Sequence, residues 1–131
     1  MSSPTTRPAT DAQPGFALET IEHGRAMALF SYASVLFGVP VFLIAFAKRD
    51  NAFALNHARA AAACFCLCYA LILMSLVSCA VFFPLAVLCY IPAIIGMYHA
   101  AAGRPAGRSA LGHLGDRAFG RIDVRPVDRA R

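Results

Sequence analysis

The feature that most constrains this chain is a long run without charge. From residue 60 to residue 103 there are 44 residues with no Asp, Glu, Lys or Arg. As one helix, at about 1.5 Å per residue, the run would be roughly 66 Å long. The hydrocarbon core of a bilayer is only about 30 Å thick. Pro84 lies near the middle, where a helix interior would lose a hydrogen bond. The run therefore predicts two membrane-spanning helices in a tight hairpin, at residues 57–78 and 82–102.

A second uncharged run covers residues 26–47, and its 22 residues are enough for one more crossing. The stretch from Gly38 to Pro40 lies halfway along it and predicts a kink or break in the helix. A re-entrant segment, which enters and leaves on one side, is the alternative. Ser31, Ser34 and Gly38 repeat at helical spacing, which indicates either a face for close helix contact or ordinary membrane-helix composition.

These runs predict an all-α fold, an integral membrane helical bundle with three transmembrane helices. Of the 131 residues, 59% are hydrophobic, and α-helices satisfy every backbone polar group within one segment, as lipid requires. We expect a disordered N-terminal tail at residues 1–15, because it is rich in Ser, Thr and Pro, a transmembrane domain at 16–103, and a basic C-terminal tail at 104–131. Cleavage of the first run as a signal peptide is disfavoured, because the segment before it is long and not basic.

The distribution of basic residues predicts the orientation. With three crossings, the loop at 48–59 lies on the same side as the C-terminal tail, and together they hold 10 basic residues. The opposite side, with the N-terminal tail, holds 2. Because Lys and Arg in short loops stay in the cytoplasm, we expect the N-terminus outside and the C-terminus inside. A composition with little Lys and many Ala and Arg residues indicates a GC-rich bacterial genome, so we expect the protein in the bacterial cytoplasmic membrane.

The C-terminal tail contains a candidate amphipathic helix at residues 109–124. Its apolar residues would share one face, namely Leu111, Leu114, Ala118 and Ile122. Basic residues that could contact anionic lipid, each adding about 1 kcal/mol, are Arg104, Arg108, Arg117 and Arg121. An unstructured basic tail is the alternative, since glycines at 112, 115 and 120 each weaken a helix by roughly 1 kcal/mol.

Five polar residues near the start of the second predicted span are candidates for an interaction site, namely Lys48, Arg49, Asp50, His57 and Arg59. An ionisable side chain within a span indicates function by default. Here His57 has either a specific role or that of an interfacial anchor, and Arg59 can extend its charge to the membrane surface. Asp50 is a candidate partner for either residue.

No residue pattern predicts catalysis. A helix places Cys64 and Cys68 on one face and Cys66 away from both, so we interpret these cysteines as small apolar residues and not as a metal site. The sequence contains no phosphate-binding loop, no HExxH motif and no carboxylate within a predicted span. We therefore expect no enzyme activity, cofactor or metal, and we expect the basic tail to bind membrane lipid and not nucleic acid.

Residues 45–63 follow a specific order, AFAKRDNAFALNHARAAAA. An apolar helix end is followed by a charged turn at 48–50, and His57, Ala58 and Ala61 open the next helix. The pattern resembles the central signature of the Tic-twenty-like family of small membrane proteins. Residues 100–103 also resemble the closing Ala-x-x-Gly of that family, whereas the Arg-Pro-Ala-Gly-Arg sequence after them departs from it.

The resemblance covers about residues 26–120 and implies a helical membrane protein that self-associates or scaffolds a complex. The family includes magnetosome membrane proteins and a component of chloroplast protein import. We therefore expect a non-enzymatic structural or interaction role, with a homo-oligomer or another membrane protein as partner. The alternative is a subunit of an oligomeric protein-conducting or solute channel.

Overall fold

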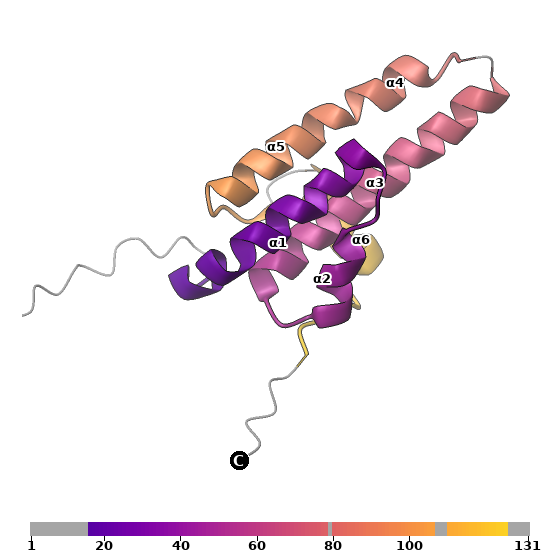
Figure 1. Ribbon diagram of the computed structural model, residues 1–131. Coiled ribbons are helices and arrows are strands. Elements are labelled where there is room, and N and C mark those ends of the chain that lie inside the picture. Colours follow the sequence, from indigo (N-terminus) through magenta and orange to yellow (C-terminus); the bar gives the residue numbers. More distant parts are fainter. Residues whose placement is uncertain (1–15, 79, 107–109, 126–131) are drawn as a thin grey trace, which may run out of the picture.

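The computed structural model describes residues 16–78, 80–106 and 110–125, and these form α-helices and their connections (Figure 1). The helices are α1 (Leu18–Phe37), α2 (Phe42–Lys48), α3 (Ala52–Val77), α4 (Phe83–Leu88), α5 (Tyr90–Ala101) and α6 (Ala110–Phe119). No strand occurs in these ranges, so the predicted all-α fold is confirmed for them. The tail at 1–15 and Arg108 lie outside the described residues.

The first uncharged run forms two helices and not one. α1 ends at Phe37 because Gly38 adopts the left-handed conformation, with φ 73°, and Pro40 follows where the helix would have to continue. α2 then runs back beside α1, and the Phe42 N–H donates a hydrogen bond to the Ser34 hydroxyl oxygen at 3.2 Å. The predicted break is confirmed, but the segment 26–47 is not a continuous helix that could cross as the third span.

α3 begins five residues earlier than predicted. Its N-cap is Asn51, whose side-chain oxygen accepts a hydrogen bond from the Ala54 N–H at 3.0 Å. Asn is a favoured N-cap because its side chain satisfies one of the free N–H groups of the first turn. Asn56, which directly precedes the predicted start of this helix at residue 57, lies inside it. The helix continues to Val77, so its 26 residues are about 39 Å long.

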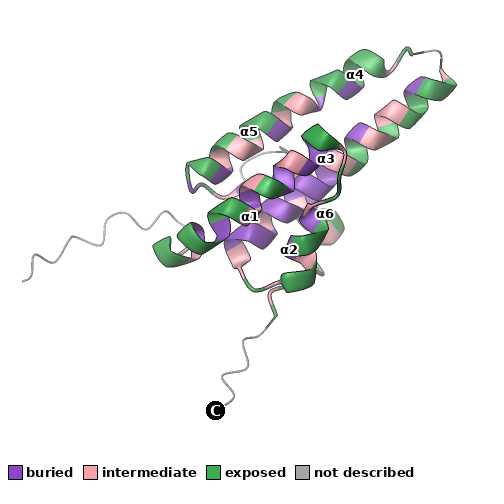
Figure 2. Cartoon of the chain, viewed as in Figure 1, coloured by how far each residue is buried: buried purple, intermediate pink, exposed green. Residues whose placement is uncertain are grey.

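The first half of α3 is the centre of the fold. α1, α2, α5 and α6 all contact α3, and between Phe53 and Cys64 only Asn56 and Arg59 are less than fully buried (Figure 2). Alanine occupies positions 58 and 60–63. Because the alanine side chain is small, the surrounding helices can approach the α3 backbone closely on every side.

α3 and the α4–α5 segment form the hairpin expected from the long run. Pro84 lies in the first turn of α4, where the missing N–H has no helical partner to lose. Pro92 cannot bond to the Leu88 carbonyl, and the helix is interrupted at Cys89. Among the described helices, two are long and apolar enough to cross a membrane, Ala52–Val77 and Phe83–Ala101. α1 is not one of them, so the prediction of three spans is not confirmed.

α6 packs against α3 through glycines, and of its predicted apolar face Leu111 packs against the core whereas Leu114 and Ala118 do not. Gly112 and Gly115 are buried, whereas Leu114 is 47% exposed and Ala118 is also exposed. A Cβ at Gly115 would lie 2.5 Å from the carbonyl oxygen of Arg59, which is closer than atoms can approach. The glycines that reduce the helix propensity of this segment therefore form its contact surface.

Candidate functional site

The charged residues of the described chain gather at one end of the bundle, which we call the charged end. It is formed by residues 16–25, by residues 48–59 and by the described part of the C-terminal segment (104–106 and 110–125), which contain every described Asp, Glu, Lys and Arg. Hydrogen bonds between these three segments bring the start of α1, the α2–α3 connection and the segment after α5 together. The far end of the bundle, around the α3–α4 connection, contains none of these residue types among those described.

Asn51 joins the start of α3 to α1. While its side-chain oxygen caps α3, its side-chain nitrogen donates a hydrogen bond to the Thr20 carbonyl oxygen at 2.9 Å. The Asn51 side chain lies against Gly24, and a Cβ at Gly24 would overlap it. The Asn51 side chain therefore caps α3 and also holds the start of α1. Because Asn51 follows α2, this contact requires α2 to return to the end of the bundle where α1 begins.

His57 is fully buried and connects three segments. Its Nε2 lies 2.8 Å from the carbonyl oxygen of Arg104, and its Nδ1 lies 3.3 Å from the hydroxyl oxygen of Tyr32 on α1. Because a carbonyl only accepts hydrogen bonds, Nε2 carries the proton and Nδ1 accepts from the Tyr32 hydroxyl. The Tyr32 ring in turn fits against Gly96 on α5, where a Cβ would overlap it. His57 is thus buried and joins α3 both to α1 and to the segment after α5.

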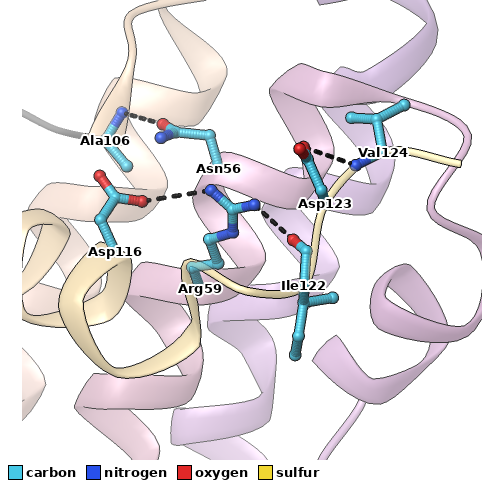
Figure 3. Close-up of polar contacts among 7 residues, drawn as sticks. All are labelled: Asn56, Arg59, Ala106, Asp116, Ile122, Asp123 and Val124. Carbon is cyan, nitrogen blue, oxygen red and sulfur yellow. Dashed lines mark hydrogen bonds and ion pairs between the residues drawn. The ribbon is translucent and has the colours of Figure 1, made fainter.

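Arg59 and Asn56 hold the C-terminal segment against α3 (Figure 3). The Arg59 guanidinium forms an ion pair with Asp116 on α6 at 3.5 Å and donates a hydrogen bond to the Ile122 carbonyl oxygen. The Asn56 side-chain oxygen accepts a hydrogen bond from the Ala106 N–H at 2.9 Å. The partner of Arg59 is therefore Asp116 and not Asp50, the partner considered from the sequence.

The charged turn between α2 and α3 has a different character. Lys48 and Asp50 are exposed, and their side chains form no hydrogen bond or ion pair with the described residues. Arg49 adopts a left-handed conformation, with φ 49°, and its carbonyl oxygen accepts a hydrogen bond from the Arg125 N–H at 2.9 Å. Beside the turn, between α1, α2 and α3, is a cavity of about 130 Å³ whose lining includes His23.

The basic residues of the C-terminal segment face outward. Arg104, Arg117 and Arg121 are exposed. On α6 the exposed Leu114 lies on the outward side with Arg117, opposite the buried Gly115. The outward surface of α6 therefore combines positive charge with an exposed apolar side chain.

The cysteines lie in the apolar part of the bundle. Cys64 and Cys68 are buried on one face of α3 and Cys66 is exposed, so the predicted division of faces is confirmed. The Cys64 thiol donates to the Cys89 carbonyl oxygen at 3.4 Å, at the interruption between α4 and α5. Across the described residues, no group of three or more His, Cys, Asp or Glu side chains is placed to hold a metal ion.

Sequence reasoning identified His57, Arg59 and the charged turn as important, but it missed Asn51, Asn56 as a connector, and Tyr32. Of these, only Asn51 carried a local signal, because it is an N-cap residue type directly before an apolar helix. Comparison with models of known protein families, with curated proteins and with solved structures finds no match.

Proposed function

We propose that this chain is a small integral membrane protein with a structural or interaction role and no enzymatic activity. The observation that carries the proposal is the separation of the surface into two parts. The charged end contains all described charged residues, whereas α3, α4 and α5 expose large apolar side chains along the hairpin. Among the most exposed are Leu73 at 62%, Leu76 at 76% and Val77 at 84%. Monomeric proteins in water rarely expose such a continuous apolar surface, and lipid covers it at no cost.

We propose a topology with two crossings and one re-entrant hairpin. α3 and α4–α5 cross the bilayer, and α1 and α2 enter it from the charged end and return to the same end. The charged end carries an excess of Lys and Arg, which favours the cytoplasmic side of a bacterial membrane. Both described ends of the chain, at Phe16 and Arg125, then lie in the cytoplasm. This differs from the expectation of an external N-terminus, which assumed three crossings.

Within this topology, the exposed charged turn and the outward face of α6 are the candidate contact surfaces. Lys48 and Asp50 are free to bind a partner at the membrane surface, and Arg104, Arg117 and Arg121 are placed to contact lipid headgroups. The buried partners of His57 give a physical reason for the His that opens the second helix in the Tic-twenty-like signature. Membership of that family, and the self-association or scaffolding that it implies, are part of this proposal.

A channel subunit is the alternative function, and the described surface favours it less. Two crossings cannot enclose a pore, so several copies would have to line it. The exposed side chains of the hairpin are apolar, including Ile91, Ile94 and Ile95 on α5, whereas an aqueous pore needs polar groups along its wall. Ion conductance by the purified, reconstituted protein would support the channel over the scaffold.

Site-directed labelling tests the topology. In a Cys79→Ser background, Ala80→Cys places a thiol at the α3–α4 connection, and Asp50→Cys places one at the charged end. A membrane-impermeant maleimide is added to bacteria whose outer membrane is permeabilised and whose inner membrane is intact. We expect it to label Ala80→Cys. Asp50→Cys and a cysteine added at either terminus should react only after the inner membrane is opened. Labelling of an N-terminal cysteine from outside would contradict the proposed topology. Recovery of the protein in the soluble fraction would contradict membrane insertion altogether.

A further inference from the structure

The helices that surround α3 end at different heights along it. The ring of Phe42, at the start of α2, packs against Phe65 with 5.3 Å between ring centroids. Gly38, which follows the last residue of α1, lies against the Tyr69 hydroxyl. α3 continues from Tyr69 to Val77, eight further residues or about 12 Å. The α1–α2 hairpin therefore stops well before the end of α3.

Beyond the α1–α2 hairpin, α3 is paired with α4. The Cys68 thiol lies 3.9 Å from the Ala86 carbonyl oxygen, so the middle of α4 is level with the end of the α1–α2 hairpin and its first turn, at Phe83, lies farther along α3. Burial follows the same division, because the first half of α3 is buried and most of the second half is exposed (Figure 2). Figure 1 shows the α3–α4 hairpin extending past the end of α1. The molecule is thus broad at the charged end and narrow at the far end.

This taper can be placed in a bilayer by counting residues along α3. If Val77 marks the far boundary, a hydrocarbon core of about 30 Å reaches back about 20 residues, to His57. On this scale Tyr69 lies about 18 Å from the near boundary, close to the midplane. The near leaflet then contains α1, α2, α3 and α5, α4 crosses the midplane beside Cys68, and the far leaflet contains only α3 and the first turn of α4. α6 adds width at the near surface, where Gly115 contacts Arg59.

We infer that the protein acts as a wedge that selects curved membranes, with the charged end on the convex side. Each helix is about 10 Å wide, so the two extra helices take up roughly 160 Å² more of the near leaflet than of the far leaflet. In a curved bilayer the convex leaflet has more area than the concave one. A protein that takes up more area in one leaflet therefore fits a curved bilayer better than a flat one when that leaflet is convex. The inference rests on the proposed membrane insertion. With the charged end in the cytoplasm, the protein would select membrane that bulges toward the cytoplasm.

Sorting between flat and tubular membrane tests the inference. The full-length protein, labelled with a fluorophore at its C-terminus, is reconstituted into giant vesicles of zwitterionic phosphatidylcholine, and a tube of about 20 nm radius is pulled outward. A membrane-impermeant quencher separates molecules whose C-terminus faces out from those whose C-terminus faces in. We expect the outward population to be enriched in the tube at least about twofold and the inward population to be depleted.

Equal densities of both orientations in tube and vesicle would overturn the wedge, and so would enrichment of the inward population. Failure of the protein to remain in the vesicles after an alkaline wash would instead contradict the proposed insertion. The double variant Glu19→Gln/Glu22→Gln serves as the matched control, because it removes two exposed charges of the charged end that are not among the residues proposed to contact lipid, and it leaves the helices in place. It should sort as the wild type does, and loss of sorting in this variant would show that charge, and not shape, is responsible.

Discussion

The contact between α6 and α3 can be tested by adding a single methyl group. A Cβ at Gly115 would lie 2.5 Å from the Arg59 carbonyl oxygen and 2.8 Å from the Ala60 nitrogen. Both are backbone atoms within a helix, so neither can rotate away. We therefore expect Gly115→Ala to move α6 outward and to weaken its attachment to α3.

Two effects of opposite sign determine the size of this change. Alanine favours helix formation over glycine by about 1 kcal/mol, which stabilises α6 by itself. Overpacking at a close contact costs about 1–3 kcal/mol. Displacement also weakens the ion pair between Arg59 and Asp116, which contributes less than about 1 kcal/mol because the Asp116 side chain is 43% exposed. A net loss of about 1.5 kcal/mol would raise the undocked fraction of α6 roughly tenfold.

Amide hydrogen exchange in nanodiscs, followed by mass spectrometry of the 110–119 peptide, measures this fraction. Gly115→Ala should exchange roughly tenfold faster than the wild type, even though its intrinsic helix propensity is higher. Leu114→Ala is the matched control, because Leu114 is exposed on the other side of α6 and alanine has similar helix propensity. Slower exchange in Gly115→Ala would refute the reasoning, since it would mean that propensity and not the contact governs α6.

Thermal unfolding in detergent tests the buried polar connections. His57→Ala leaves the Tyr32 hydroxyl and a backbone carbonyl unpaired and should lower the free energy of unfolding by about 3 kcal/mol or more. Tyr32→Phe should lower it by about 1–2 kcal/mol. Equal losses would show that the backbone bond of His57 contributes little. Asn51→Ala should lose about 1–2 kcal/mol, and Asn51→Asp should lose less because it keeps the helix cap. Asp116→Asn should lose less than about 1 kcal/mol, and a larger loss would show that its exposed pair with Arg59 is much stronger than such pairs usually are.

The apolar hairpin and the helix break were predictable because each has a local cause. Charge-free length decides how often a helix can cross a bilayer, and a Gly followed by a Pro stops a helix whatever surrounds it. The faces of Cys64 and Cys68 followed in the same way from helical periodicity. The polar partners of His57 were not predictable, since Tyr32 and Arg104 are distant in sequence and only the packing of α1 and the post-α5 segment against α3 brings them together.

The glycines of α6 show how a correct local rule can leave out a tertiary contact. Intrinsic propensity treats Gly112 and Gly115 as costs to the helix, and the apolar pattern only indicated a helix on the membrane surface with Leu114 on its apolar face. In the folded chain the partner surface is the alanine-rich half of α3, and close approach of two backbones there needs residues without side chains. The pattern of small residues on both helices held this information, but it becomes visible only once the two helices are known to meet.

The number of crossings could not be decided from the first apolar run, because its length fits two arrangements. As one helix, 22 residues extend about 33 Å, enough for the whole bilayer. Divided at Gly38, the leg from residue 26 to Phe37 has 12 residues and extends about 18 Å, enough to reach the midplane. Average hydropathy is the same in both cases. The position of the break separates the two arrangements, since a break near the middle leaves one leg that can enter the bilayer and a second leg that can return. The hydrogen bond between Asn51 and Thr20 then holds the two ends of the run together, so the choice between span and hairpin depends on polar residues outside the apolar run.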